Sequence, residues 1–252
     1  MKNISLLALA SATLLLASCN RDLPPSNLTS VSGTLKEATF NEQTFAFGTT
    51  AWTGGAGTLI AVGDDGEEVA RTALAADGSF DLSLPRTLAA GRLTELDVSE
   101  LNDVEGCTGT LKSSTRANGA LASFSVDAGK DGEVAPAAFR INRDSAGNPT
   151  GITVTVGLLV YVDRSVTIQG SQTCTQEGAT ARLNVDWKLG QGWNKVSTTF
   201  TLSDSGSGTI NLTSGTLPTD WLYLEGTGAA SPLGAASLKG LNFKVPQIPF
   251  FR

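Results

Sequence analysis

The segment from residue 151 to residue 162 has the sequence GITVTVGLLVYV. Apolar side chains occupy every second position of this segment, namely Ile152, Val154, Val156, Leu158, Val160 and Val162. A period of two places these side chains on one face of a β-strand. The opposite face begins polar, with Thr153 and Thr155, and ends apolar, with Leu159 and Tyr161. We therefore predict a central strand that is covered on both faces at one end.

Shorter segments with the same pattern lie on both sides of this strand. The alternation is clearest between residues 183 and 189, and it recurs in the segments 79–84, 122–126, 137–141 and 196–202. The segment 58–62 is a short apolar run, and the segment 69–74 follows it as its expected partner strand. Turn-forming residues separate these segments, as in Gly63-Asp64-Asp65-Gly66 and Asp77-Gly78. Short strands joined by such turns are typical of all-β folds rather than of alternating strands and helices. The predicted fold class is mainly β, an antiparallel β-sandwich with either one domain or two β subdomains.

The first residues have the features of a secretory signal peptide. Lys2 supplies a positive charge, an uncharged apolar run extends from Leu6 to Ala17, and small residues precede Cys19. The run is shorter than the ~20 residues that a membrane-spanning helix needs. We therefore expect residues 1–18 to be removed from the mature protein.

The sequence Leu16-Ala17-Ser18-Cys19 resembles the lipobox of bacterial lipoprotein precursors. This resemblance implies that the Cys19 thiol is diacylated, that the chain is cut before it, and that the new N-terminus is acylated. Two or more acyl chains anchor a protein firmly, because each buried CH₂ contributes about 0.8 kcal/mol. Asn20 follows where some bacteria use aspartate for inner-membrane retention, which implies an extracytoplasmic location at the outer membrane or cell surface. The alternative is an ordinary secreted protein with a coincidental cysteine.

We expect five segments along the chain. They are the signal peptide (1–18), a polar lipidated tether (19–32), a first β-sandwich-like subdomain (33–104), a second β-rich subdomain (105–237) and an apolar C-terminal tail (238–252). Residues 85–104, at the subdomain boundary, form either one short helix or a connecting loop, because Gly91 interrupts their loosely spaced leucines.

The composition excludes several classes of function. A net charge of −6 and a pI near 4.7 argue against binding to nucleic acid or to anionic lipid headgroups. The 252 residues include no histidine, which removes Ser-His-Asp and Cys-His catalysis and the usual zinc, copper and non-haem iron sites. Only three cysteines are present, too few for iron–sulfur clusters. We therefore predict no cofactor and no metal.

The cysteine count predicts one disulfide. If Cys19 carries lipid, as the lipobox resemblance implies, Cys107 and Cys174 remain as an even pair in an oxidising compartment. The alternative is a pair of buried thiols. A bond between these two residues would join segments that lie far apart in the sequence.

Residues 57–85 resemble the small β-sandwich repeats of the carboxypeptidase-regulatory-like group. The residues that carry this resemblance are a strand, a turn, a second strand and the segment Asp77-Gly78-Ser79-Phe80-Asp81-Leu82. Members of that group usually act as accessory or scaffold modules, so the resemblance implies a non-catalytic role.

A few residues are candidates for ligand contacts. Trp52 and Trp193 lie near glycine-rich turns and are candidates for stacking on a sugar, whereas Trp187 fits the inward face of a strand. The acidic segment 64–68 is either a calcium loop or a solvated turn, and it lacks EF-hand spacing. A glycosidase needs only two carboxylates, but the sequence indicates no particular pair among its acidic residues.

The tail from residue 238 to residue 252 is apolar and contains Pro246 and Pro249. It either packs back on the core or inserts into a partner protein of the cell envelope. The function predicted from the sequence is that of a lipid-anchored envelope protein with a structural or partner-binding role. A carbohydrate-binding surface module and a hydrolase with paired carboxylates are the alternatives.

Overall fold

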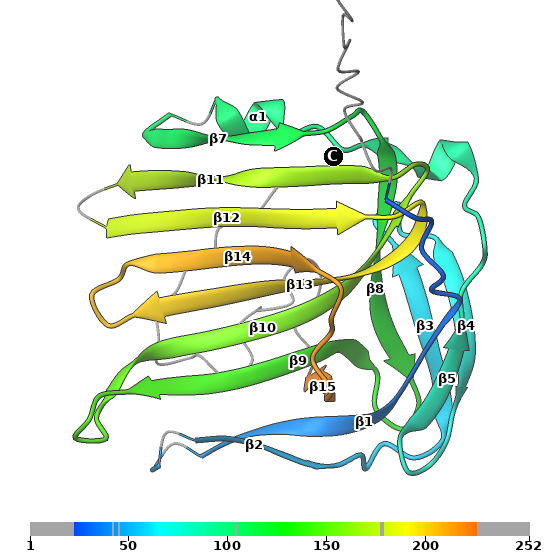
Figure 1. Cartoon of the computed structure of the whole chain (residues 1–252). Helices are drawn as coiled ribbons and strands as arrows, with labels where there is room; N and C mark the ends of the chain where they lie inside the picture. Colours follow the sequence, from blue (N-terminus) through cyan, green and yellow to red (C-terminus); the bar gives the residue numbers. More distant parts are fainter. Residues whose placement is uncertain (1–22, 42, 45, 104, 177–178, 226–252) are drawn as a thin grey trace, which may run out of the picture.

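A computed structural model of the chain describes residues 23–225, except positions 42, 45, 104, 177 and 178 (Figure 1). The predicted signal peptide, Cys19 and the 238–252 tail lie outside these described residues. The strands are β1 (Ser30–Asn41), β2 (Ala46–Ala51), β3 (Gly57–Gly63), β4 (Glu68–Leu74), β5 (Ser79–Ser83), β6 (Thr94–Glu95), β7 (Cys107–Ser113), β8 (Asn118–Asp127), β9 (Gly132–Arg143), β10 (Pro149–Val162), β11 (Val166–Gln176), β12 (Ala179–Leu189), β13 (Gly192–Ser203), β14 (Gly208–Ser214) and β15 (Trp221–Glu225). The helical elements are η1 (Ala90–Arg92) and α1 (Ser99–Asn102).

The strands form one large mixed sheet, and the prediction of a mainly β fold is confirmed. Along its main path the order is β2-β1-β15-β9-β8-β10-β13-β14-β12-β11-β7. Most neighbours are antiparallel, but β1 pairs with β15 and β12 pairs with β14 in parallel. In Figure 1 one strand lies below another in a broad front layer, in the order β7, β11, β12, β14, β13, β10 and β9.

Part of the sheet curls into a ring. β8 pairs with β3, β9 and β10, β9 pairs with β15, and β15 pairs with β1. β1 also pairs with β5, and β3 pairs with β4. The ring closes between β4 and β5, which lie side by side without a ladder of backbone hydrogen bonds between them. In Figure 1, β3, β4, β5 and β8 run steeply across the direction of the front layer. The ring therefore makes a second layer at one end of the sheet.

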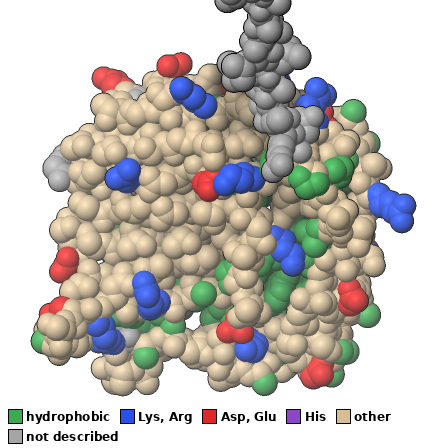
Figure 2. Space-filling view, in the orientation of Figure 1, with side chains coloured by type: hydrophobic (Ala, Val, Ile, Leu, Met, Phe, Trp, Pro, Cys, Tyr) green, Lys and Arg blue, Asp and Glu red, His purple; other side chains and the backbone are tan. Residues whose placement is uncertain are grey.

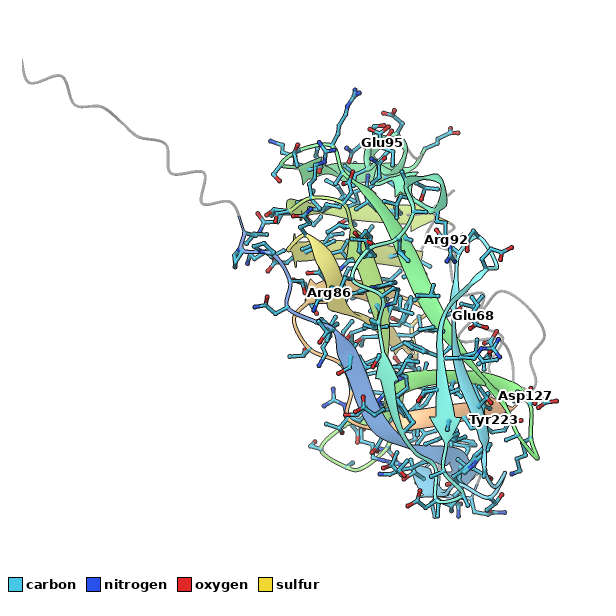
Figure 3. The ribbon with its side chains drawn as sticks, turned by 90° about the vertical axis from the view of Figure 1, so that its right-hand side faces the viewer. Glu68, Arg86, Arg92, Glu95, Asp127 and Tyr223 are labelled. Atoms are coloured by element: carbon cyan, nitrogen blue, oxygen red, sulfur yellow. A yellow bond between two sulfur atoms is a disulfide. The ribbon has the colours of Figure 1, made fainter. Side chains whose placement is uncertain are left out.

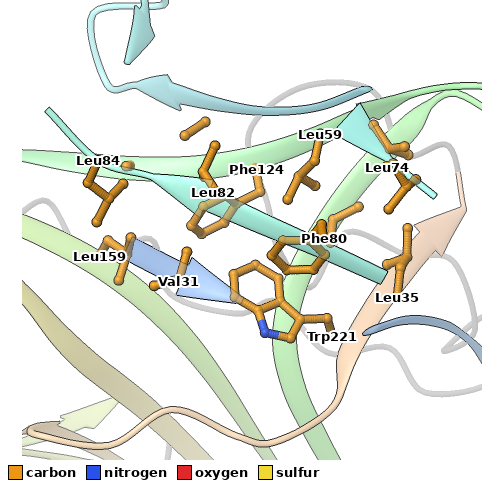
Figure 4. Packing of buried hydrophobic residues seen from close by; sticks show 14 of the residues in the cluster. Val31, Leu35, Leu59, Leu74, Phe80, Leu82, Leu84, Phe124, Leu159 and Trp221 are labelled. Carbon is orange, nitrogen blue, oxygen red and sulfur yellow. The ribbon is translucent and has the colours of Figure 1, made fainter. Parts of the chain in front are cut away.

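Aliphatic and aromatic side chains together fill the interior of this ring (Figure 4). The indole of Trp221 meets the rings of Phe80 and Phe124 edge-on, with both centroid separations at 4.9 Å. Gly33 makes room for this cluster, because a Cβ atom there would lie 2.4 Å from Cδ1 of Trp221. β1 changes its partner from β5 to β15 just after Gly33, so the glycine marks the corner between the two layers.

The two faces of β10 differ as the sequence predicts. Leu159 and Tyr161 belong to the ring interior, whereas Val160 and Val162 pack on the opposite face, and all four are buried. Earlier in the strand, Thr155 faces Thr199 across the ladder with 3.0 Å between their hydroxyl oxygens. This threonine-rich side of the sheet is half-exposed and mostly polar, as the front view in Figure 2 shows.

The reverse side of the front layer is apolar, and we call it the apolar sheet face. One part packs around Trp187 and Leu189, where Leu96 and Val98 from the segment around β6 and α1 join it. The other part is centred on Val154 and Val156. Half-buried side chains surround this second part, namely Phe47, Phe139, Ile141, Leu158, Leu202 and Leu224.

Strands from residues 33–104 pair with strands from residues 105–237, through β3–β8 and β1–β15. The two predicted subdomains therefore share one sheet. Residues 85–104 form mainly a connection that contains η1, β6 and the single turn of α1.

In the part of the chain that the structure describes, no helix is long and apolar enough to cross a membrane.

Candidate functional site

The first described residues lie on the body of the protein. The Ser165 hydroxyl donates to the carbonyl oxygen of Leu23 at 2.9 Å, and the Ser26 amide donates to the carbonyl of Gln191 at 2.8 Å. The Ser26 hydroxyl donates to the carbonyl of Trp193, and Leu28 forms a β-bridge with the same residue. The described part of the predicted 19–32 tether is thus bound to the body from Leu23 onward.

This contact depends on the turn between β12 and β13. A Cβ atom on Gly190 would lie 2.3 Å from the carbonyl oxygen of Pro24, so only glycine lets the segment approach this closely. Gly192 follows with a positive φ of 101°. Asn194 stabilises the turn, since its side chain accepts from the Gly190 amide at 2.9 Å and donates to the Gly190 carbonyl at 2.7 Å.

Cys107 and Cys174 form a disulfide, as the cysteine count predicts. The two residues stand directly opposite each other on the antiparallel pair β7–β11. β7 ends the main path of the sheet, and its outer edge is partly capped by Asn102 of α1, whose side chain exchanges two hydrogen bonds with the Leu111 backbone. The disulfide therefore ties an edge strand to the rest of the sheet.

A groove of about 440 Å³ opens between the start of β1 and the connection from β14 to β15. Ser30, Val31 and Ser32 line one wall, and residues 215–219 line the other. Lys195 and Trp221 complete the lining. In Figure 2 apolar side chains are visible in this hollow, below and to the right of the centre.

Hydrogen bonds hold the second wall of the groove in place. The Gly215 amide donates to the Lys195 carbonyl at 2.8 Å, and the Ser197 hydroxyl donates to the Thr216 carbonyl at 2.6 Å. Asp220, just beyond this wall, pairs with Lys36 at 2.7 Å. Among the described residues Lys195 has no ion-pair partner, and the groove lining contains no carboxylate. The groove therefore offers one cation and several hydroxyl groups.

The structure places both tryptophans predicted to bind a ligand inside the ring. Trp52 is 5% exposed and Trp193 is 1% exposed. Their indole nitrogens donate to backbone carbonyls, Trp52 to Gly55 at 2.7 Å and Trp193 to Pro85 at 2.8 Å. Neither indole presents a face to solvent, because the segment around Leu28 covers Trp193 and Tyr223 packs against Trp52.

The acidic turn between β3 and β4, a calcium-loop candidate in the sequence, binds the side chain of Arg92. Nε of Arg92 lies 2.6 Å from Oδ2 of Asp65, and a second nitrogen lies 3.0 Å from Oδ1. Hydrogen bonds from Arg92 lower the pKa of Asp65 to about 2. Arg92 also donates to the carbonyls of Glu67 and Glu68, and Figure 3 shows it above Glu68 on the same side. This turn is a structural clamp between η1 and the β3–β4 hairpin.

Within the described ranges, two carboxyl groups have a raised pKa, and desolvation is the main cause for each. They belong to Asp64, in the clamped turn, and Glu133, near the start of β9. Neither lines the groove. Across the described residues, no group of three or more His, Cys, Asp or Glu side chains is placed to hold a metal ion.

No family model matches the chain, and neither a curated protein nor a solved structure matches it.

Sequence reasoning missed the groove and the bound N-terminal segment. The groove lining comes from β1, β13 and the β14–β15 connection, which only the fold brings together. For the bound segment one signal was present, because the turn contains two glycines, Gly190 and Gly192. Such glycines often mark the close approach of another backbone.

Proposed function

We propose that this chain is a lipid-anchored protein of the bacterial cell envelope, with a non-catalytic role in binding or holding a partner. The observation that carries the proposal is a lipobox-like Leu16-Ala17-Ser18-Cys19 placed just before a β body with an internal disulfide. Disulfides persist in oxidising compartments outside the cytoplasm. The disulfide therefore supports the extracytoplasmic location that the resemblance to lipoprotein precursors implies, and we place the anchor at the outer membrane or cell surface because Asn20, not aspartate, follows Cys19.

The non-catalytic role is supported by the chemistry of the described surface. The chain has no histidine, and the groove offers one lysine with hydroxyl groups but no carboxylate. General acid–base catalysis needs a proton donor or acceptor with a pKa near the working pH, within reach of the substrate. The resemblance of residues 57–85 to accessory β-sandwich repeats points in the same direction.

A partner protein in the envelope is the second half of the proposal. The apolar segment 238–252 lies outside the described residues, and we propose that it contacts this partner. Cross-linking in intact cells, followed by mass spectrometry, identifies the partner. We expect one stoichiometric cross-linked protein with the full chain and none after deletion of residues 238–252. Cross-links that persist after the deletion would place the contact elsewhere on the body.

The anchor is tested by substituting the lipidated residue. Cys19→Ser is expected to move the protein from the membrane fraction to the soluble fraction, because the acyl chains are its only proposed hold on the membrane. Ser18→Ala is the matched control, since it keeps a small residue before the cysteine. Retention of Cys19→Ser on membranes would contradict the anchor.

A carbohydrate-binding module is the second candidate, and the groove is the observation that favours it. A volume of about 440 Å³ lies in the range typical of small-molecule sites. Ser30, Ser32 and Thr216 could exchange hydrogen bonds with sugar hydroxyls there. Glycan-array binding that is lost in Lys195→Ala and kept in Lys188→Ala, a lysine on the sheet surface, would establish this function. Absence of binding to any glycan would remove it.

A further inference from the structure

The segment that leads out of the body toward Cys19 is short. Leu23 is held by Ser165, and Ser26 is held by the backbone of Gln191 and Trp193. Only Asn20, Arg21 and Asp22 separate Cys19 from Leu23. A fully extended chain covers at most about 3.5 Å per residue, so the Cα atoms of Cys19 and Leu23 are at most about 14 Å apart.

The body is long compared with this tether. β10 has 14 residues and therefore extends over about 45 Å. Its C-terminal end leads into the turn at Asp163–Ser165, which touches Leu23, while its N-terminal end leaves the turn at residues 144–148. Figure 1 shows the β9–β10 hairpin turn at the opposite side of the front layer from the first described residues. One end of the sheet is thus bound close to the anchor and the other is far from it.

Three connections lie in contact at the end of the sheet that is bound near Cys19. They are the β10–β11 turn, the β7–β8 connection and the β12–β13 turn. Asp163 accepts from the Asn118 amide at 2.9 Å and from its side chain at 3.0 Å, which joins the β10–β11 turn to the start of β8. The Gln191 side chain donates to the Asp163 carbonyl at 3.0 Å, which joins the β12–β13 turn to both. We call this surface the anchor end.

The chemistry of the anchor end fits the surface of a bilayer rather than its interior. The exposed side chains of these three connections are polar or charged, and two opposite-charge pairs lie there, Arg164 with Asp163 and Arg116 with Glu95. The bound N-terminal segment adds two exposed prolines, Pro24 and Pro25. A surface with so few exposed apolar side chains lies against headgroups without deep insertion, since insertion needs a large apolar face. It also lacks the excess of basic residues that would attract anionic lipid, so its position depends on the acyl chains.

We propose that the anchor end lies against the lipid headgroups and that the β9–β10 and β13–β14 turns point away from the membrane. This inference rests on the proposed lipid anchor at Cys19. A short tether restricts the angles that the body can adopt relative to the bilayer. The anchor end therefore stays close to the headgroups, and the body does not rotate freely above the membrane. A partner protein would then approach the far end or the sides of the sheet.

Two variants of the lipidated full chain, each with one added cysteine, test this orientation. Arg164→Cys places a thiol on the anchor end, and Ser145→Cys places one on the far β9–β10 turn. Each is labelled with a small fluorophore and bound to phosphatidylethanolamine–phosphatidylglycerol vesicles that contain a headgroup nitroxide quencher. We expect quenching to be at least threefold stronger at position 164. Equal quenching, or stronger quenching at position 145, would overturn the orientation.

A longer tether is the matched control. Insertion of twenty Gly and Ser residues between Asp22 and Leu23 adds a flexible span of about 25 Å. The quenching difference is then expected to disappear while the protein stays on the vesicles. A difference that survives the insertion would show that the tether does not set the orientation. Vesicle flotation of each sample separates the two proposals, because failure of the unmodified lipoprotein to float contradicts the anchor itself.

Discussion

Removal of the Cys107–Cys174 disulfide should weaken the folded body substantially. The double substitution Cys107→Ser and Cys174→Ser replaces each thiol with a residue of similar size at a half-buried position. The two residues face each other directly on β7 and β11, so the backbone ladder does not need to move. The loss should therefore reflect the cross-link itself rather than a disturbed core.

The magnitude follows from the length of chain that the bond closes. The cysteines are 67 positions apart. For a loop of this length, the chain-entropy account gives about 4 kcal/mol of lost stability, as an upper figure. In a domain of this size each kcal/mol lowers the melting temperature by about 2–4 °C. We therefore expect the melting temperature to fall by about 8–16 °C.

Urea unfolding of the Cys19→Ser form, followed by tryptophan fluorescence, measures this change directly. The four tryptophans include Trp187 and Trp193, both buried, so their emission reports on loss of the core. The same protein treated with reductant should match the double serine variant within error. A stability loss below 1 kcal/mol, or a reductant with no effect on the cysteine-containing form, would refute the role given to the bond.

Other predictions concern the anchor, the clamped turn and the tail. Cys19→Ser should release at least nine-tenths of the protein from membranes, measured by fractionation and immunoblot; an unchanged distribution would count against lipidation. Asp65→Asn should lower the free energy of unfolding by about 1 kcal/mol at pH 6. The shift of the Asp65 pKa from 3.8 to about 2 corresponds to at most about 2.4 kcal/mol. Water screens the partly exposed pair of Asp65 and Arg92, so the expected loss is smaller than this upper figure. The folded-state pKa is the lower one, so this stability is present above pH ~4 and is lost as the pH falls toward 2; a difference that persists unchanged at pH 2 would contradict the clamp. Deletion of residues 238–252 should abolish the cross-linked partner and leave the melting temperature within about 2 °C, whereas a large fall together with increased dye binding would place the segment on the protein's own apolar sheet face.

The strands of this fold could be predicted well from local pattern. The alternation from Ile152 to Val162 predicts β10, and the change on its opposite face from Thr153 to Tyr161 predicts which half is buried on both sides. Each of these features depends on a few neighbouring residues. Period-two alternation is therefore enough to predict where a strand lies and which of its faces is buried.

The pairing of strands could not be predicted in the same way. The segment 79–84 follows β4 through a tight Asp77-Gly78 turn, yet β5 forms its ladder with β1. β1 in turn pairs in parallel with β15, at the other end of the described chain. These pairings are decided by which apolar faces fill the ring together, and no local pattern records that choice.

The candidate sites show the same difference between features that can be read from the sequence and features that depend on the fold. The disulfide could be inferred because counting cysteines needs no geometry. Trp193 sits beside a glycine-rich turn, which suggested exposure, but the incoming segment at Leu28 covers it. The groove beside Lys195 was invisible in the sequence because its walls come from three separate parts of the chain.

The lipid on Cys19 is the claim on which the proposed function and the orientation both depend. Trypsin digestion of protein from the membrane fraction should release a peptide that spans Cys19 to Arg21. Mass spectrometry is predicted to find this peptide with a diacylglyceryl group on the cysteine and no residue before it. An unmodified Cys19, or a chain that still carries residue 18, would contradict the account.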